Sequence, residues 1–308
     1  MAATILGRMV TFAAMLAIGA FCAWRGMVDR ACLRTMIAVS TRVFLPAMVF
    51  STICERMDRA LLLAQLPMAA LAAAFYGVVV WLVRVLADRL RLDAERSAAF
   101  RLTFIFGNTG FIGLPILMTV FPGTGVANLV LFMLVDQVVF WTYGASLACG
   151  EKGAPDWLTR LKGFLNPNIV AILIALGCVA ADVPFCGAAV DFLATIGAAA
   201  TPLCMVCLGA MCFFSDIVHV LRGRELYVGA AAKMVALPLL AAPLLGALPV
   251  APDVAASMVL MIAMPPTVLV PLTVETNGGD GPYATALSVT AVALAVFTLP
   301  LVAGLIGV

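Results

Sequence analysis

Two short segments rich in glycine or proline lie in the middle of apolar stretches. The first, residues 107–115, reads Gly-Asn-Thr-Gly-Phe-Ile-Gly-Leu-Pro, and the second, residues 265–271, reads Pro-Pro-Thr-Val-Leu-Val-Pro. Glycine and proline there interrupt a helix and free backbone N–H and C=O groups that lipid cannot bond. Such backbone persists only where protein covers it or where it lines a polar cavity. A helix that begins at a break presents free N–H groups and a positive dipole end, which favour an anion.

The residues at these two breaks are the candidates for ligand binding. The Asn108 amide can donate to a carboxylate or accept from a cation, and it can also cap its own helix. Thr109 and Thr267 add hydroxyl groups, and Gly110 allows either a ligand or a neighbouring helix to approach the backbone closely. Four prolines are expected to interrupt the helices, with ordinary proline kinks as the alternative: Pro115, Pro265, Pro266 and Pro271.

Two ionisable residues fall inside or beside apolar runs. Asp136 lies within the run 131–140, where a carboxylate costs about 2.5–3.5 kcal/mol on insertion scales, so we expect it to face the protein interior. It can carry a coupling proton there, or form a structural hydrogen bond with Gln137. Lys233 either reaches a ligand carboxylate or Asp136, or extends its amine to the membrane interface.

Composition indicates an integral membrane protein. Of the 308 residues, 64% are hydrophobic and 11% are charged, against roughly 25% charged residues in a typical soluble domain. Little chain is left for a soluble enzyme domain, and a net charge of +2 without a basic patch does not indicate nucleic-acid binding. The apolar start is interpreted as a first span, because no small-residue cleavage site precedes a soluble region.

Ten stretches are long enough to cross a bilayer, which takes about 20 apolar residues. They lie at about 5–24, 34–54, 61–86, 98–121, 125–149, 165–184, 188–213, 225–248, 253–276 and 283–306. The connectors are short, and the polar stretch 150–163 is interpreted as the linker between two halves.

Lys and Arg set the expected orientation. Eleven of them fall on the side of the odd-numbered connectors and three on the other side. The odd connectors are therefore expected in the cytoplasm, with both termini outside, in a multi-pass protein of the cell (inner) membrane. Arg42 is placed near the cytoplasmic end of the second span, and Glu275 near the outer face.

Ten spans divide into five and five, and an odd number makes the second half enter the membrane from the opposite side. We therefore predict an all-α integral membrane protein with one domain, 1–308, built from two inverted five-helix repeats. The first repeat covers about 1–150 and the second about 160–308. Each break then lies in the fourth span of its repeat, which is the fourth or the ninth span of the chain.

Several segments resemble the auxin efflux carrier family. Segments 106–115 and 263–280 resemble its fourth-span and ninth-span signatures, and 165–169, 200–210 and 233–238 fit the intervening spans. Their order and spacing identify the chain as a bacterial-type member, within the bile acid/auxin/arsenite-like superfamily. One departure is Val-Pro at positions 270 and 271, where bacterial relatives more usually have Asn-Ala, so the substrate is not inferred from either branch.

The resemblance implies a fold in which the broken fourth and ninth helices cross at the membrane centre. It also implies that helices 1, 2, 6 and 7 form a scaffold, that helices 3–5 and 8–10 move, and that the substrate bears a carboxylate. No cofactor is expected. No metal is expected either, since Cys204 and Cys207 are most simply packing residues.

The hypothesis is a secondary active transporter, not an enzyme, that moves a small organic anion by alternating access. Coupling would be to a proton gradient or to the membrane potential. The expected partners are the anion, a proton or sodium, the lipid bilayer and a second copy in a homodimer. The alternatives are a sodium-coupled organic anion symporter, a channel, and an intramembrane enzyme, although an aspartyl protease would need a second buried Asp beside Asp136.

Overall fold

The computed structural model describes residues 2–149, 165–185, 187–215 and 217–305, and all regular elements in these ranges are helices. Seven of the helices are long and apolar enough to cross a membrane: Ile5–Trp24, Arg30–Arg56, Pro67–Arg89, Gly125–Ala148, Gly187–Phe214, Arg224–Gly246 and Gly281–Leu305. The predicted all-helical, multi-pass character is confirmed. The linker predicted at 150–163 lies outside the described residues.

Three of the long helices are single elements: α1 (Ala2–Trp24), α5 (Pro67–Arg89) and α19 (Gly281–Leu305). Others contain a π-helical turn, as in α2 (Arg30–Val39), η1 (Ser40–Phe44) and α3 (Leu45–Arg56); α8 (Gly125–Val139), η3 (Phe140–Gly144) and α9 (Ala145–Cys149); and α15 (Arg224–Ala230), η5 (Ala231–Ala236) and α16 (Leu237–Gly246). The remaining elements outside the breaks are α4 (Arg59–Ala64), α11 (Pro167–Ala180), α12 (Gly187–Gly197), α13 (Ala200–Phe214) and α14 (Ile217–Arg222).

Two helical stretches are interrupted in the middle. In the first, α6 (Ala94–Ile105) ends before residues 106–108, and η2 (Thr109–Gly113) with α7 (Leu114–Val120) continues beyond them. In the second, α17 (Pro252–Ile262) ends before residues 263–268, and α18 (Leu269–Thr276) follows. The structure therefore has both interruptions that glycine and proline predict.

The expectation that all four prolines interrupt helices is wrong for Pro115 and Pro271. Pro115 lies within the helix Thr109–Val120, directly after the π-helical turn η2. A π-helical turn shifts the hydrogen-bond register and so accommodates a residue that has no N–H. Pro271 is in the first turn of α18, where the N–H of any residue lacks a partner within the helix.

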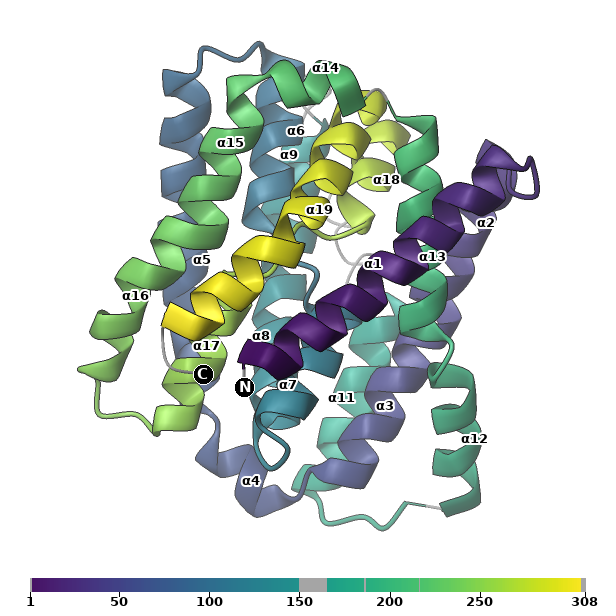
Figure 1. Cartoon of the computed structure of the whole chain (residues 1–308). Helices are drawn as coiled ribbons and strands as arrows, with labels where there is room; N and C mark the ends of the chain where they lie inside the picture. The colour runs from purple at the N-terminus through teal and green to yellow at the C-terminus, as the bar shows by residue number, and fades with distance from the viewer. Residues whose placement is uncertain (1, 150–164, 186, 216, 306–308) are drawn as a thin grey trace.

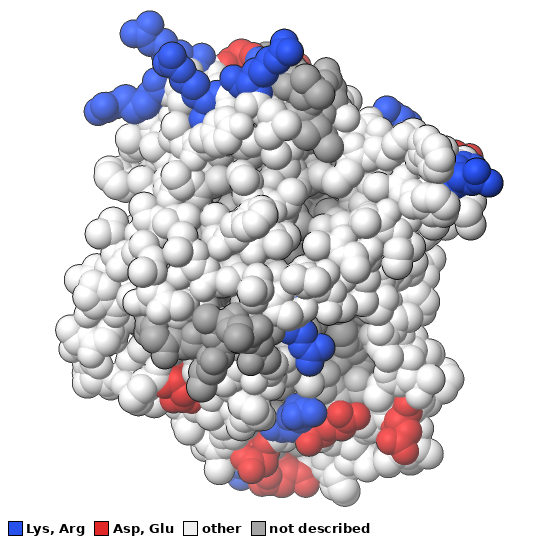
Figure 2. Space-filling view, in the orientation of Figure 1, with Lys and Arg blue, Asp and Glu red and all other residues white. Residues whose placement is uncertain are grey.

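Charged side chains gather at the two ends of the bundle, and the face between them is mainly uncharged (Figure 2). We call one end the arginine-rich end; its arginines are Arg25, Arg30, Arg34, Arg89, Arg91, Arg96, Arg222 and Arg224. At this end the Arg96 guanidinium lies 5.4 Å from the Tyr283 ring centroid. This contact joins the third and the ninth connectors, which are both odd-numbered. At the opposite end Arg59 pairs with Asp182 at 3.3 Å, joining two even-numbered connectors.

The expectation that Glu275 lies at the outer face, opposite the odd connectors, is wrong. Glu275 forms an ion pair with Arg34 at the arginine-rich end. A chain that enters at Pro252, on the opposite end, and runs through α17 and α18 must leave at the arginine-rich end. The connector after the ninth stretch is therefore on the same side as the connector before α2.

Helices α1 and α13 pack with their backbones in contact, and α1 crosses the front of the molecule beside α13 in Figure 1. A Cβ atom on Gly19 would lie 2.0 Å from the carbonyl oxygen of Val206, and one on Gly209 would lie 1.9 Å from that of Leu16. Because lipid supplies no hydrophobic force between helices, such close approach of small residues is a main source of helix association.

Replacing Gly209 by alanine should force α1 and α13 apart, because the new methyl group would overlap the Leu16 carbonyl. We expect Gly209→Ala to cost about 1–3 kcal/mol of stability, measured as a lower melting temperature of the purified protein. Gly7→Ala on α1 is the matched control, since nothing lies within 4 Å of a Cβ at Gly7. Equal melting temperatures for the two variants would contradict this packing.

Candidate functional site

The two interruptions meet and satisfy each other's backbone groups. Asn108 N–H donates to the Pro265 carbonyl at 2.6 Å, and Thr267 N–H donates to the Phe106 carbonyl at 3.2 Å. These bonds make an antiparallel bridge between Gly107 and Pro266. Groups that glycine and proline free from their helices are thus paired across the crossing, as the interior of a membrane requires.

A cavity of about 470 Å³ has this crossing at its base. Asn108, Thr109, Gly110, Thr267 and Asp136, all predicted from sequence, line it. It extends toward the arginine-rich end, because its lining includes residue 165, which precedes α11, and residue 276, which ends α18. Among the described residues, none of α7 or α17 lines it, so the cavity reaches one end of the bundle only.

The base of the cavity holds hydrogen-bond donors without acceptors. The Asn108 side-chain oxygen accepts from Phe111 N–H at 3.3 Å, which fixes the amide orientation, and its Nδ2 has no partner although the residue is 1% exposed. Asn108 therefore caps the helix, as one alternative held, and keeps a free donor. In the described part of the chain, the N–H groups of Thr109 and Gly110 also lack acceptors. Three unpartnered donors near one helix N-terminus are suited to an anion.

Asp136 is buried in the wall of the same cavity. One carboxylate oxygen accepts a hydrogen bond from the Tyr76 hydroxyl, and the other lies 3.4 Å from the Gln137 side-chain nitrogen. The Tyr76 ring packs against Phe106, which adjoins the first break, with ring centroids 6.0 Å apart. The carboxyl group is thus held in a fixed position where the cavity can reach it.

Lys233 does not line the cavity. It lies in η5 with 1% of its surface exposed, and its amine donates to the Met264 carbonyl at the second break. A Cβ on Gly107 would lie 3.4 Å from that amine, so Lys233 is behind the crossing. Its burial excludes the interfacial alternative. The Lys233 amine instead donates a hydrogen bond to the Met264 carbonyl, which the second break leaves without a helix partner. It also interacts electrostatically with Asp136.

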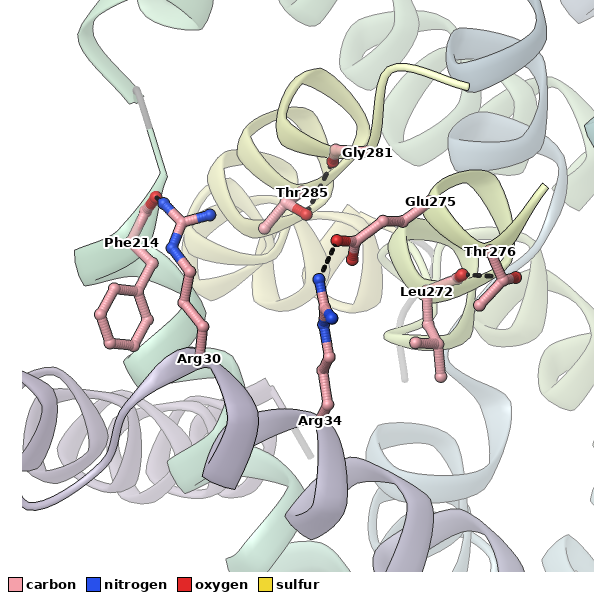
Figure 3. A network of polar contacts seen from close by, with 8 residues as sticks. All are labelled: Arg30, Arg34, Phe214, Leu272, Glu275, Thr276, Gly281 and Thr285. Atoms are coloured by element: carbon pink, nitrogen blue, oxygen red, sulfur yellow. Dashed lines mark hydrogen bonds and ion pairs between the residues drawn. The ribbon is translucent and has the colours of Figure 1, made fainter. Parts of the chain in front are cut away.

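The four prolines predicted as site residues do not line the cavity. Pro265 and Pro266 contribute backbone to the crossing, whereas Pro115 lies in the following helix. Pro271 lines a separate, smaller cavity of about 80 Å³ at the arginine-rich end. Figure 3 shows this region, where the Arg34 side chain points to Glu275 and so joins α2 to α18.

The structure adds two polar residues that the sequence did not single out as site residues. Asn168 is 3% exposed, lines the cavity and has an unpartnered side-chain oxygen. Thr201 donates to the Phe111 carbonyl at 3.1 Å and so links α13 to η2. Asn166 caps this helix, so the cap does not explain the second amide in its first turn, Asn168. An amide without a capping role in an apolar helix is the sequence signal that could have identified Asn168.

An apolar helix bundle with two crossing interruptions at the base of a one-sided cavity defines a membrane transporter. The family model described as membrane transport protein matches residues 4–156 and 157–303. The chain belongs to this family, the auxin efflux carriers. A comparison with curated proteins gave no match.

Lys233→Met should destabilise the protein, because it leaves the buried Met264 carbonyl unpaired and removes a positive charge near Asp136. The expected cost is about 1–3 kcal/mol, measured by thermal or denaturant unfolding. Adding Asp136→Asn to Lys233→Met should cost less than the two single changes summed, since the charges interact. Additive costs would show that the two side chains act independently.

Proposed function

We propose that the protein is a secondary active transporter that moves a small organic anion by alternating access. The observation that carries this is the set of free donors at the crossing: Asn108 Nδ2 and the N–H groups of Thr109 and Gly110. Charge-assisted hydrogen bonds to such donors are about twice as strong as neutral ones. A carboxylate bound there would also meet the positive end of the helix Thr109–Val120.

The one-sided cavity supports alternating access. The far side of the crossing is filled by buried side chains of α7, α8 and α17, among them Leu117, Leu129 and Val259. The arginine-rich end is the cytoplasmic end by the distribution of Lys and Arg, so the proposed state is open to the cytoplasm, with both termini outside. A second state would close this side and open the other around the same donors.

Helix contacts support a scaffold and a moving group within a ten-span, inverted-repeat arrangement. α1 packs mainly on α13, and α3 on α11 and α12, which are the proposed first, second, sixth and seventh spans. α5 packs on α6 and α8, and α16 on α17, which belong to the other group. The cavity is lined from both groups, by Leu45 and Asn168 on one side and by Asn108 and Asp136 on the other. Relative movement of the groups would therefore change access to it.

Asp136 is proposed as the proton-carrying group. It is a carboxyl that lines the cavity while bonded to Tyr76 and Gln137, so it can exchange protons with water in the cavity. Sodium coupling is the alternative, because backbone carbonyls at broken helices can hold a sodium ion.

Small carboxylates should stabilise the purified protein against heat, and Asn108→Ala should weaken their binding about tenfold, because one donor to the anion is lost. The screen uses acetate, butyrate, succinate and benzoate, with the dissociation constant taken from the shift in melting temperature. Asn128→Ala is the control: this buried amide bonds Ser257 at 3.0 Å and does not line the cavity. Unchanged binding in Asn108→Ala would refute the site.

Asp136→Asn should abolish uptake driven by a pH gradient in proteoliposomes, because the coupling carboxyl is lost, yet it should retain counterflow exchange of substrate. Sodium and pH gradients are imposed separately on the wild-type protein. Uptake driven by sodium alone would identify a sodium symporter, and linear flux without counterflow would identify a channel. Full pH-driven uptake in the variant would remove Asp136 from the proposed mechanism.

A further inference from the structure

We propose that Arg42 is the residue that selects for the negative charge of the substrate, by pairing with it in the cavity above the crossing. The inference rests on the proposed function. It adds to the proposed binding site a residue that the sequence analysis places near the cytoplasmic end of the second span. Arg42 is one of the residues that line the cavity, and it is exposed. The base donors orient an oxygen ligand, whereas Arg42 supplies a full positive charge.

The depth of Arg42 in the bundle is the first argument. It is near the middle of the 27-residue helix Arg30–Arg56, not near the cytoplasmic end of a span as expected. A guanidinium at that depth is costly in lipid and is retained where it faces water in a cavity or a partner. Its exposure and its position in the cavity lining indicate water.

The direction of the side chain is the second argument. The lining residues of this helix are Ala38, Thr41, Arg42 and Leu45, a spacing that places all four on one helix face. Leu45 contacts the crossing, since its Cδ1 would lie 2.9 Å from a Cβ on Gly110. Arg42 is three residues before Leu45, within the π-helical turn η1. It therefore lies between the base of the cavity and its opening at the arginine-rich end.

The absence of a partner is the third argument. Among the described residues Arg42 forms no ion pair, hydrogen bond or ring contact. The neighbouring arginines of the same helix are engaged: Arg34 pairs with Glu275, and Arg30 donates to the Phe214 carbonyl at 3.0 Å. Lys233 is committed to the Met264 carbonyl. Arg42 is thus a cation that the cavity presents to a ligand.

A guanidinium suits this role because it stays charged and can donate two parallel hydrogen bonds to one carboxylate. A neutral amide of the same shape could still use the Asn108 donor and the free N–H groups of Thr109 and Gly110, but it would gain nothing from the Arg42 charge. Discrimination between an acid and its amide is therefore the property assigned to Arg42, whereas overall affinity also depends on Asn108.

The experiment measures binding of acetate, butyrate, succinate and benzoate, each beside its amide, to wild type, Arg42→Gln and Arg42→Lys. For the acids that bind, Arg42→Gln should weaken affinity about 10- to 100-fold, with little change for the amides. Arg42→Lys should recover part of the loss. Acid binding should weaken with rising salt in the wild type, and less so in Arg42→Gln.

Arg34→Gln is the matched control, since Arg34 is on the same helix and does not line this cavity. It should keep the acid-to-amide preference of the wild type. If Arg42→Gln keeps that preference while Asn108→Ala weakens acid binding, the role of Arg42 is refuted and the proposed function stands. If the wild type binds none of the acids, both proposals fail. Because Arg42 is exposed, its replacement should leave the melting temperature without ligand nearly unchanged.

Discussion

The crossing at the base of the site follows from the need to pair backbone polar groups away from water. Two helices that break inside a membrane each leave N–H and C=O groups without partners, at a cost of several kcal/mol per group. The bonds from Asn108 to Pro265 and from Thr267 to Phe106 remove most of that cost. The donors that this pairing leaves over, on Asn108, Thr109 and Gly110, would form the proposed anion cradle at the base of the cavity.

Charged side chains lie on both sides of the crossing. Behind it, Lys233 bonds a freed carbonyl and interacts with Asp136, which Tyr76 holds in place. In front of it, Arg42 lines the cavity and has no partner among the residues that the structure describes. Both cations lie in π-helical turns, η5 and η1, and η2 forms the start of the helix below the cradle. Such turns rotate the side chains beyond them relative to a regular helix, and they are frequent at functional sites.

The sequence predicts the breaks well and the individual partners poorly. Glycine and proline within apolar runs mark residues 107–115 and 265–271 as breaks, and the structure has interruptions at residues 106–108 and 263–268. The arginines predict which connectors share an end. The partner of Lys233 and the depth of Arg42 depend on how each helix is rotated and shifted against its neighbours, which is decided by packing rather than by hydropathy. The prediction that Pro115 and Pro271 interrupt helices is wrong for a related reason. Proline is tolerated after a π-helical turn and in the first turn of a helix.

The glycine contacts between α1 and α13 have a mechanical consequence. Each helix places a glycine against a carbonyl oxygen of the other, Gly19 on Val206 and Gly209 on Leu16, so the two backbones fit in one register. A shift of one turn would bring Met15 or Met205 to a position that tolerates no side chain. Helices α1 and α13 cannot slide past each other along their shared interface unless they first move apart. In the proposed mechanism the two helices would therefore move as one unit, and the relative movement of helices would take place along other helix surfaces.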